Sequence, residues 1–138
     1  MPENPARSFR EALRIMEDKR YGKIVNISSI AGISGLTAHN SAYSAAKAGV
    51  VGFTKAAAIE VIGANVNVNC IAAGGITTPG LQKMVDSSPQ MRERMVQAIP
   101  QGRLGEVDEY ASLALYLASD DAAYMVGQIL SPNGGCVV

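Results

Sequence analysis

The sequence predicts a single α/β domain over residues 1–138, with about three parallel strands joined by crossover helices. Two observations favour this class. Helical and strand-like patterns alternate along the whole chain, and each expected strand is a short apolar run rich in β-branched residues. The composition agrees, because 48% of the residues are hydrophobic and only 17% are charged, as in a domain with buried strands.

The spacing of apolar residues defines each expected element in chain order. Helices repeat apolar residues every three or four positions, strands are short apolar runs, and Gly, Asn and Pro mark the breaks. We therefore expect a helix at 8–19, a strand at 24–27, a polar loop at 32–40, a long Ala-rich helix at 42–62, a strand at 66–71, a Met-rich helical stretch at 81–99, a helix at 107–118 and a strand at 128–130.

Helix-breaking residues support these boundaries. Gly22 is expected to end the first helix, and the segment 63–65 ends the long helix because asparagine tolerates the left-handed conformation. The segment 100–102, Pro-Gln-Gly, breaks the Met-rich stretch. Acidic residues around position 107 suit the positive end of the helix dipole there.

Charge and composition exclude several classes of function. Twelve basic residues balance twelve acidic ones, so neither nucleic acid nor an anionic membrane surface is an expected partner. No apolar stretch is long enough to span a membrane, and residues 1–5 lack the profile of a signal peptide. Cys70 and Cys136 lack metal-ligand spacing and are expected to be buried, reduced thiols. We expect a cytoplasmic protein without a metal.

The segment Tyr43-Ser44-Ala45-Ala46-Lys47 carries the clearest chemical signal. The i, i+4 spacing places a phenol and an ammonium group on the same face of the expected helix. An ammonium group stabilises a nearby phenolate, so the pair suits proton transfer to or from a carbonyl or alcohol oxygen. Ser29, at the carboxyl end of the first strand, can donate a hydrogen bond to that oxygen.

Taken with further segments in the same order, this pattern resembles the short-chain dehydrogenase/reductase family. The resemblance spans almost the whole chain, and its weight comes from the ordered set, since Tyr-x-x-x-Lys alone is a weak motif. The matching segments are residues 22–32, 43–50, 68–78, 99–103, 126–129 and 133–135.

The resemblance implies a partial Rossmann-like, doubly wound fold and a set of residue roles. Tyr43 would be the catalytic acid/base, Lys47 would tune it and bind the nicotinamide ribose, and Ser29 would polarise the substrate oxygen. Cofactor contacts would come from Tyr43, Lys47, Gly74, Ile76 and Thr78, with NAD or NADP as the cofactor. The substrate would be a small secondary alcohol or ketone.

Four departures from the family pattern are visible. No Gly-x-Gly occurs in the sequence, so the family's N-terminal dinucleotide-binding half is expected to be missing. The family's central asparagine would align near Met1, and Asn4 lies three places out of register. Ala73 replaces the usual proline, which is expected to loosen the following turn. The interval between Ser29 and Tyr43 is about one residue longer than is common, in a loop where His39 is expected to be a solvated side chain.

Two functions remain open at this stage. One is an oxidoreductase of the short-chain type, impaired by the missing half. The other is a truncated, non-catalytic domain that acts as a folded oligomer or as a partner subunit. In either case the strand at 24–27 is expected to be an apolar sheet edge, which favours a homo-oligomer that also covers the helices starting at Ser8 and Ala42.

Overall fold

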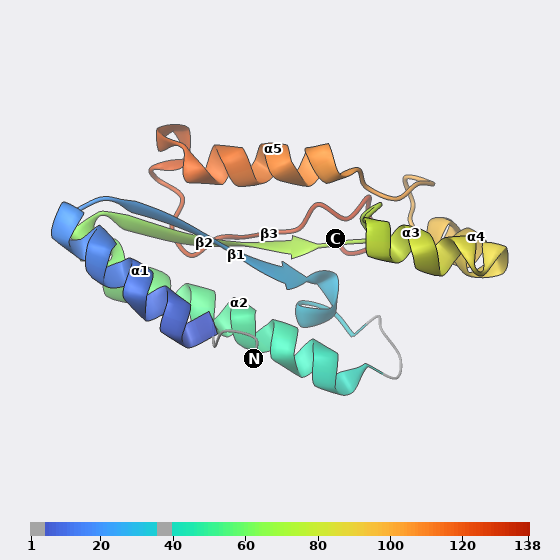
Figure 1. Ribbon diagram of the computed structural model, residues 1–138, viewed down its shortest axis with the longest axis horizontal. Coiled ribbons are helices and arrows are strands. Elements are labelled where there is room, and N and C mark those ends of the chain that lie inside the picture. The colour runs from blue at the N-terminus through green and yellow to red at the C-terminus, as the bar shows by residue number, and fades with distance from the viewer. Residues whose placement is uncertain (1–4, 36–39) are drawn as a thin grey trace.

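The computed structural model describes residues 5–35 and 40–138, and over these residues it shows a three-stranded sheet between helices (Figure 1). Short 3₁₀ turns follow several elements: η1 (Ile30–Gly32), η2 (Ile62–Ala64) and η3 (Asp120–Ala122). The main elements are α1 (Pro5–Lys19), β1 (Gly22–Ser29), α2 (Ser41–Val61), β2 (Val66–Ala73), α3 (Pro79–Asp86), α4 (Pro89–Gln97), α5 (Val107–Ala118) and β3 (Ile129–Leu130).

The sheet has the order β1-β2-β3 with all strands parallel, which confirms the predicted α/β class and crossover connections. The register of β1 on β2 runs from Gly22 opposite Val66 to Ser29 opposite Ala73. Parallel strands end at the same edge of a sheet, so the loops after Ser29 and Ala73 emerge side by side. That edge, beyond which α3 and α4 lie in Figure 1, is where the candidate site is built.

Each face of the sheet is covered by its own helical layer and apolar core (Figure 1). On the α1 and α2 face, Val66 and Val68 pack with Ala58 and Val61 of α2. On the α5 face, Ile71 packs with Leu117. Alternate residues of β2 thus serve opposite layers, as the two-residue period of a strand requires.

Two buried asparagines extend the sheet where β3 is too short to do so. The Asn67 amide donates to the carbonyls of Ala123 and Met125 at 2.8 and 3.0 Å, and the Asn69 amide donates to Met125 at 2.8 Å. The Asn69 side-chain oxygen accepts from the Gln128 N–H at 2.9 Å. Buried polar groups need such partners, so these amides fix the segment that leads into β3.

Several element boundaries differ from those expected. The expected irregular helical stretch at 81–99 consists of two helices, because Pro89 occupies the first turn of α4 and cannot continue α3. The first helix ends with Arg20 in the left-handed region (φ 51°), and Gly22 already belongs to β1. Asn65 does adopt the expected left-handed conformation, with φ 58°. The helix at 107–118 is as predicted.

The remaining expectations concern the exposure of the sheet edge and of the two cysteines. β1 lies at the edge of the sheet and pairs only with β2 in the described part of the chain, and Ile27 is 55% exposed. Cys70 is buried as expected, whereas Cys136 is partly exposed. None of the described helices is long and apolar enough to cross a membrane. Asn4 and His39 lie outside the described residues.

Candidate active site

The two serines at the end of β1 have different roles: Ser28 bonds to α2, and Ser29 caps η1. Ser28 is buried, and its hydroxyl donates to the Lys47 carbonyl of α2 at 2.8 Å. Ser29 caps η1, where its Oγ accepts from the Ala31 N–H at 3.2 Å. Because Ser29 accepts that bond, its own O–H can still be donated to another oxygen.

A close backbone approach fixes the turn after β1 against α2. A Cβ added to Gly32 would stand 2.6 Å from the carbonyl carbon of Lys47, which is closer than any side chain tolerates. Only glycine allows this contact. The Ser29 turn and the helix turn that carries Lys47 are therefore held in one rigid arrangement.

Tyr43 and Lys47 lie one turn apart at the start of α2 and converge. The Lys47 ammonium lies 5.8 Å from the centre of the Tyr43 ring, and it donates to the Ile27 carbonyl of β1 at 3.3 Å. Tyr43 is 47% exposed. Among the described residues, no protein group is hydrogen-bonded to its hydroxyl, which leaves that group available to a ligand.

The residues around Ser29, Tyr43 and Lys47 form one wall of the site. The segment after β2, residues 74–78, forms the other wall. Ile76 forms a parallel bridge with Gly105, and Thr77 N–H donates to the Gly105 carbonyl at 2.8 Å. Thr78 then caps α3, where its Oγ accepts from the Leu81 N–H at 3.2 Å. Because the Thr78 oxygen serves there as the acceptor, its own O–H can still be donated to another oxygen.

These two walls enclose an open cleft of about 380 Å³. All six residues singled out in the sequence line it, so distant segments are brought to one place. The lining also includes Leu81 of α3 and Met95 of α4, apolar residues to which the sequence analysis assigned no role. The remaining lining residues are Ile27, Ser28, Ser29, Tyr43, Lys47, Ala73, Gly74, Gly75, Ile76 and Thr78.

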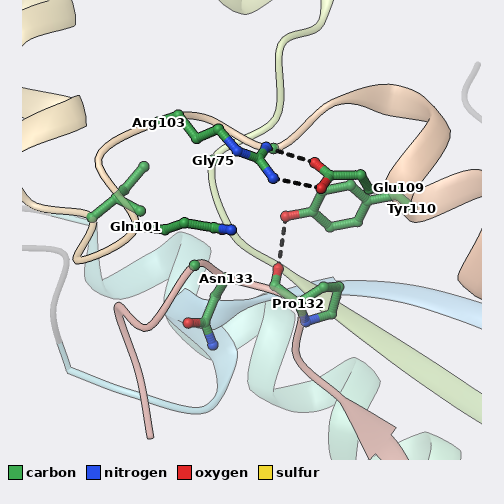
Figure 2. A pocket seen from close by; sticks show the side chains of 10 residues that line it. Gly75, Gln101, Arg103, Glu109, Tyr110, Pro132 and Asn133 are labelled. Carbon is green, nitrogen blue, oxygen red and sulfur yellow. Dashed lines mark hydrogen bonds and ion pairs between the residues drawn. The ribbon is translucent and has the colours of Figure 1, made fainter.

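A second cavity, of about 220 Å³, lies next to the cleft and shares Gly75 with it (Figure 2). Arg103 and Glu109 form a two-pronged ion pair there, with N–O distances of 2.8 and 2.6 Å. The hydrogen bond from Arg103 lowers the pKa of Glu109 to about 2, with the Glu106 backbone N–H adding to the effect. The Tyr110 hydroxyl donates to the Pro132 carbonyl at 2.7 Å. The Arg103, Glu109 and Tyr110 side chains are thus hydrogen-bonded within the protein.

The cleft has the donors that the nicotinamide end of a dinucleotide needs. The Lys47 ammonium suits ribose hydroxyls, and the Thr78 O–H suits a carboxamide oxygen. The pyrophosphate end has no comparable match, because the sequence contains no Gly-x-Gly turn. The residues present therefore fit the nicotinamide half of NAD or NADP.

Solved structures of known reductases share this fold. Levodione reductase is 37% identical with a TM-score of 0.81, over 89% of this chain and 49% of that protein. YwfH, an NADPH-dependent reductase involved in bacilysin biosynthesis, is 28% identical with a TM-score of 0.88, over 96% of this chain and 53% of that protein.

Curated relatives give the same result at the level of sequence. The 3-oxoacyl-[acyl-carrier-protein] reductase FabG of Thermotoga maritima is 42% identical over 123 residues, which are 89% of this chain and 48% of that protein. Acetoacetyl-CoA reductase of Shinella zoogloeoides is 47% identical over 122 residues, 87% of this chain and 48% of that protein. The chain thus spans about half the length of these relatives.

The family comparison covers almost every residue. Residues 4–137 match the family model described as enoyl-(acyl carrier protein) reductase. Together with the ordered motifs and the parallel sheet, this match shows that the chain belongs to the short-chain dehydrogenase/reductase family of oxidoreductases.

Proposed function

We propose that this chain carries the catalytic residues of a nicotinamide-dependent reductase whose substrate is the ketone of a 3-oxoacyl thioester. One observation carries the proposal: Ser29, Tyr43 and Lys47 line the same cleft as four residues of the segment after β2, namely Gly74, Gly75, Ile76 and Thr78. Tyr43 as proton donor, Lys47 as cation and Ser29 as hydrogen-bond donor then lie next to the segment whose donors suit a nicotinamide. That combination suits reduction of a carbonyl group.

The protein's part in the reaction is proton supply and charge stabilisation. When bound, a reduced nicotinamide supplies a hydride to the carbonyl carbon. Tyr43 gives its phenolic proton to the carbonyl oxygen, so that the ketone becomes a secondary alcohol. Ser29 donates a hydrogen bond to that oxygen, and Lys47 stabilises the phenolate until it regains a proton from water.

The choice of a 3-oxoacyl thioester has two supports. The relatives include 3-oxoacyl-[acyl-carrier-protein] reductases and an acetoacetyl-CoA reductase. In this chain, Leu81 and Met95 line the cleft, and they give an acyl chain an apolar surface to lie on.

Acetoacetyl-CoA is a practical substrate for the test. With NADPH or NADH, the protein is expected to consume the reduced dinucleotide only when acetoacetyl-CoA is present, and to form the 3-hydroxy product in equal amount. Absence of any product at high protein concentration would contradict the proposal.

Over the described residues, β1 leaves one edge of the sheet unpaired, and this edge supports a second candidate function, that of an oligomer or a partner subunit. β1 is an eight-residue strand at the edge of the sheet, and the chain spans about half the length of its relatives. An exposed edge favours pairing with another chain. Apolar side chains are also exposed on the two neighbouring helices, namely Ile15 of α1 and Phe53 and Ile59 of α2.

Sedimentation at micromolar concentration tests this second candidate. A homo-oligomer is expected, and a clean monomer would contradict it. An oligomer that binds no dinucleotide and forms no product would favour the non-catalytic role over the reductase.

A further inference from the structure

The cleft wall from Gly74 to Thr78 is supported from behind by two loops. On one side, Gly105 N–H donates to the Gly75 carbonyl at 2.9 Å, and Thr77 N–H donates to the Gly105 carbonyl at 2.8 Å. On the other side, Gly74 N–H donates to the Pro132 carbonyl at 3.2 Å. The position of the wall therefore depends on where Gly105 and Pro132 are held.

One side chain, Tyr110 of α5, contacts both supports. Its hydroxyl donates to the Pro132 carbonyl at 2.7 Å (Figure 2). The same oxygen accepts from the Gly74 N–H. Its ring lies against Gly105, where an added Cβ would stand 2.8 Å from Tyr110 Cε2. A shift of this side chain would therefore move the backbone supports of both Gly74 and Thr77.

Tyr110 is itself firmly placed and remains a donor. It packs against the apolar core beneath α5, which contains Ile71 and Leu117. Burial raises the pKa of its phenol above the ordinary tyrosine value, and contact with the Gly74 backbone opposes this less strongly. The start of α5 is fixed by the ion pair between Arg103 and Glu109. The hydroxyl thus stays protonated near neutral pH.

We propose that Tyr110 is a positioning residue, which sets the Gly74–Thr78 wall for the nicotinamide by holding the Pro132 carbonyl and packing on Gly105. Tyr110 is not among the residues that line the cleft, and it acts on the cleft through the backbone that it holds. This proposal rests on the proposed function for its effect on the cofactor, but its effect on the wall does not depend on activity.

The variant Tyr110→Phe removes the hydroxyl and keeps the ring. Loss of one hydrogen bond to a shared acceptor is expected to weaken NADPH binding about fivefold, equivalent to ~1 kcal/mol. The matched control is Tyr116→Phe, at a partly exposed tyrosine of the same helix. A purely structural role would lower the thermal midpoint without weakening NADPH binding by the folded protein, and that result would overturn the proposal.

Amide hydrogen exchange at Gly74 and Thr77 gives a second readout. Exchange at both amides is expected to be faster in Tyr110→Phe than in Tyr116→Phe, while amides of β2 are unchanged. If the unaltered protein binds no dinucleotide, the proposed function fails and the exchange rates alone decide the role of Tyr110. Equal rates in the two variants would overturn it.

Discussion

The cleft and the neighbouring cavity share Gly75, and each holds a tyrosine and a cation, but they use these groups differently. In the cavity, Arg103 donates twice to Glu109 and once to the Leu104 carbonyl, and Tyr110 donates to Pro132. In the cleft, over the described residues, Lys47 makes one hydrogen bond of 3.3 Å and the Tyr43 hydroxyl has no protein partner. The polar side chains of the cavity are hydrogen-bonded within the protein and support its structure. Those of the cleft keep hydrogen-bonding capacity that a ligand can use.

The largest expected effect comes from removing the hydroxyl in the cleft. Tyr43→Phe is expected to lower kcat for ketone reduction by about 10²–10⁴-fold, because it removes the proton donor. Dinucleotide binding should remain, since the ring is kept. Tyr124→Phe, at a fully exposed tyrosine, is the control. Equal turnover in Tyr43→Phe and the control would remove Tyr43 from the mechanism.

Lys47, the cation of the cleft, is expected to contribute to the affinity for the cofactor. Lys47→Ala should weaken NADPH binding by about 10–100-fold, the effect of losing a charged hydrogen-bond donor. Lys55→Ala, two turns further along α2 and outside the cleft, provides the control. Fluorescence titration measures both. The interpretation of Lys47 as a ribose contact would be wrong if both variants bind NADPH equally.

The rigid contact behind the cleft can be broken by one methyl group. Gly32→Ala would place a Cβ 2.6 Å from the Lys47 backbone and is expected to lower the free energy of unfolding by about 1–3 kcal/mol. In Gly52→Ala the new Cβ meets nothing within 4 Å, and the variant should be more stable by up to ~1 kcal/mol. Chemical denaturation measures both changes, and a stable Gly32→Ala would contradict the close approach.

The smallest expected effect is the pH dependence of the ion pair in the cavity. The pKa of Glu109 falls from 4.5 to about 2 on folding, so its stabilising contribution is complete above about 4.5 and is lost as the pH falls toward 2. Glu109→Gln should therefore be less stable than the unaltered protein at neutral pH, and this difference should shrink in acid. Glu60→Gln serves as the control, and thermal midpoints across this range measure the effect. A difference that is constant with pH would contradict it.

The sequence predicted the α/β class, the parallel strands and the Ser29, Tyr43 and Lys47 group because each depends on a local pattern, whereas the family resemblance supplied the other three cleft residues. Short apolar runs gave the strands, and the motif spacing gave Tyr43 and Lys47. The break between α3 and α4 was missed although Pro89 signals it, because the apolar pattern continues across it. The roles of Asn67, Asn69 and Tyr110 depend on loops distant in sequence, and no local pattern reports them.

The central claim is that the cleft receives a nicotinamide between Lys47 and the Gly74–Thr78 wall. It is tested most directly by titrating the isotope-labelled protein with reduced nicotinamide mononucleotide, which lacks the adenosine half, and following the backbone amides by NMR. We expect saturable shifts at residues 74–78 and around Ser29 and Lys47, with the amides of α1 unchanged. An absence of shifts at millimolar ligand, or shifts confined to other surfaces, would contradict the account.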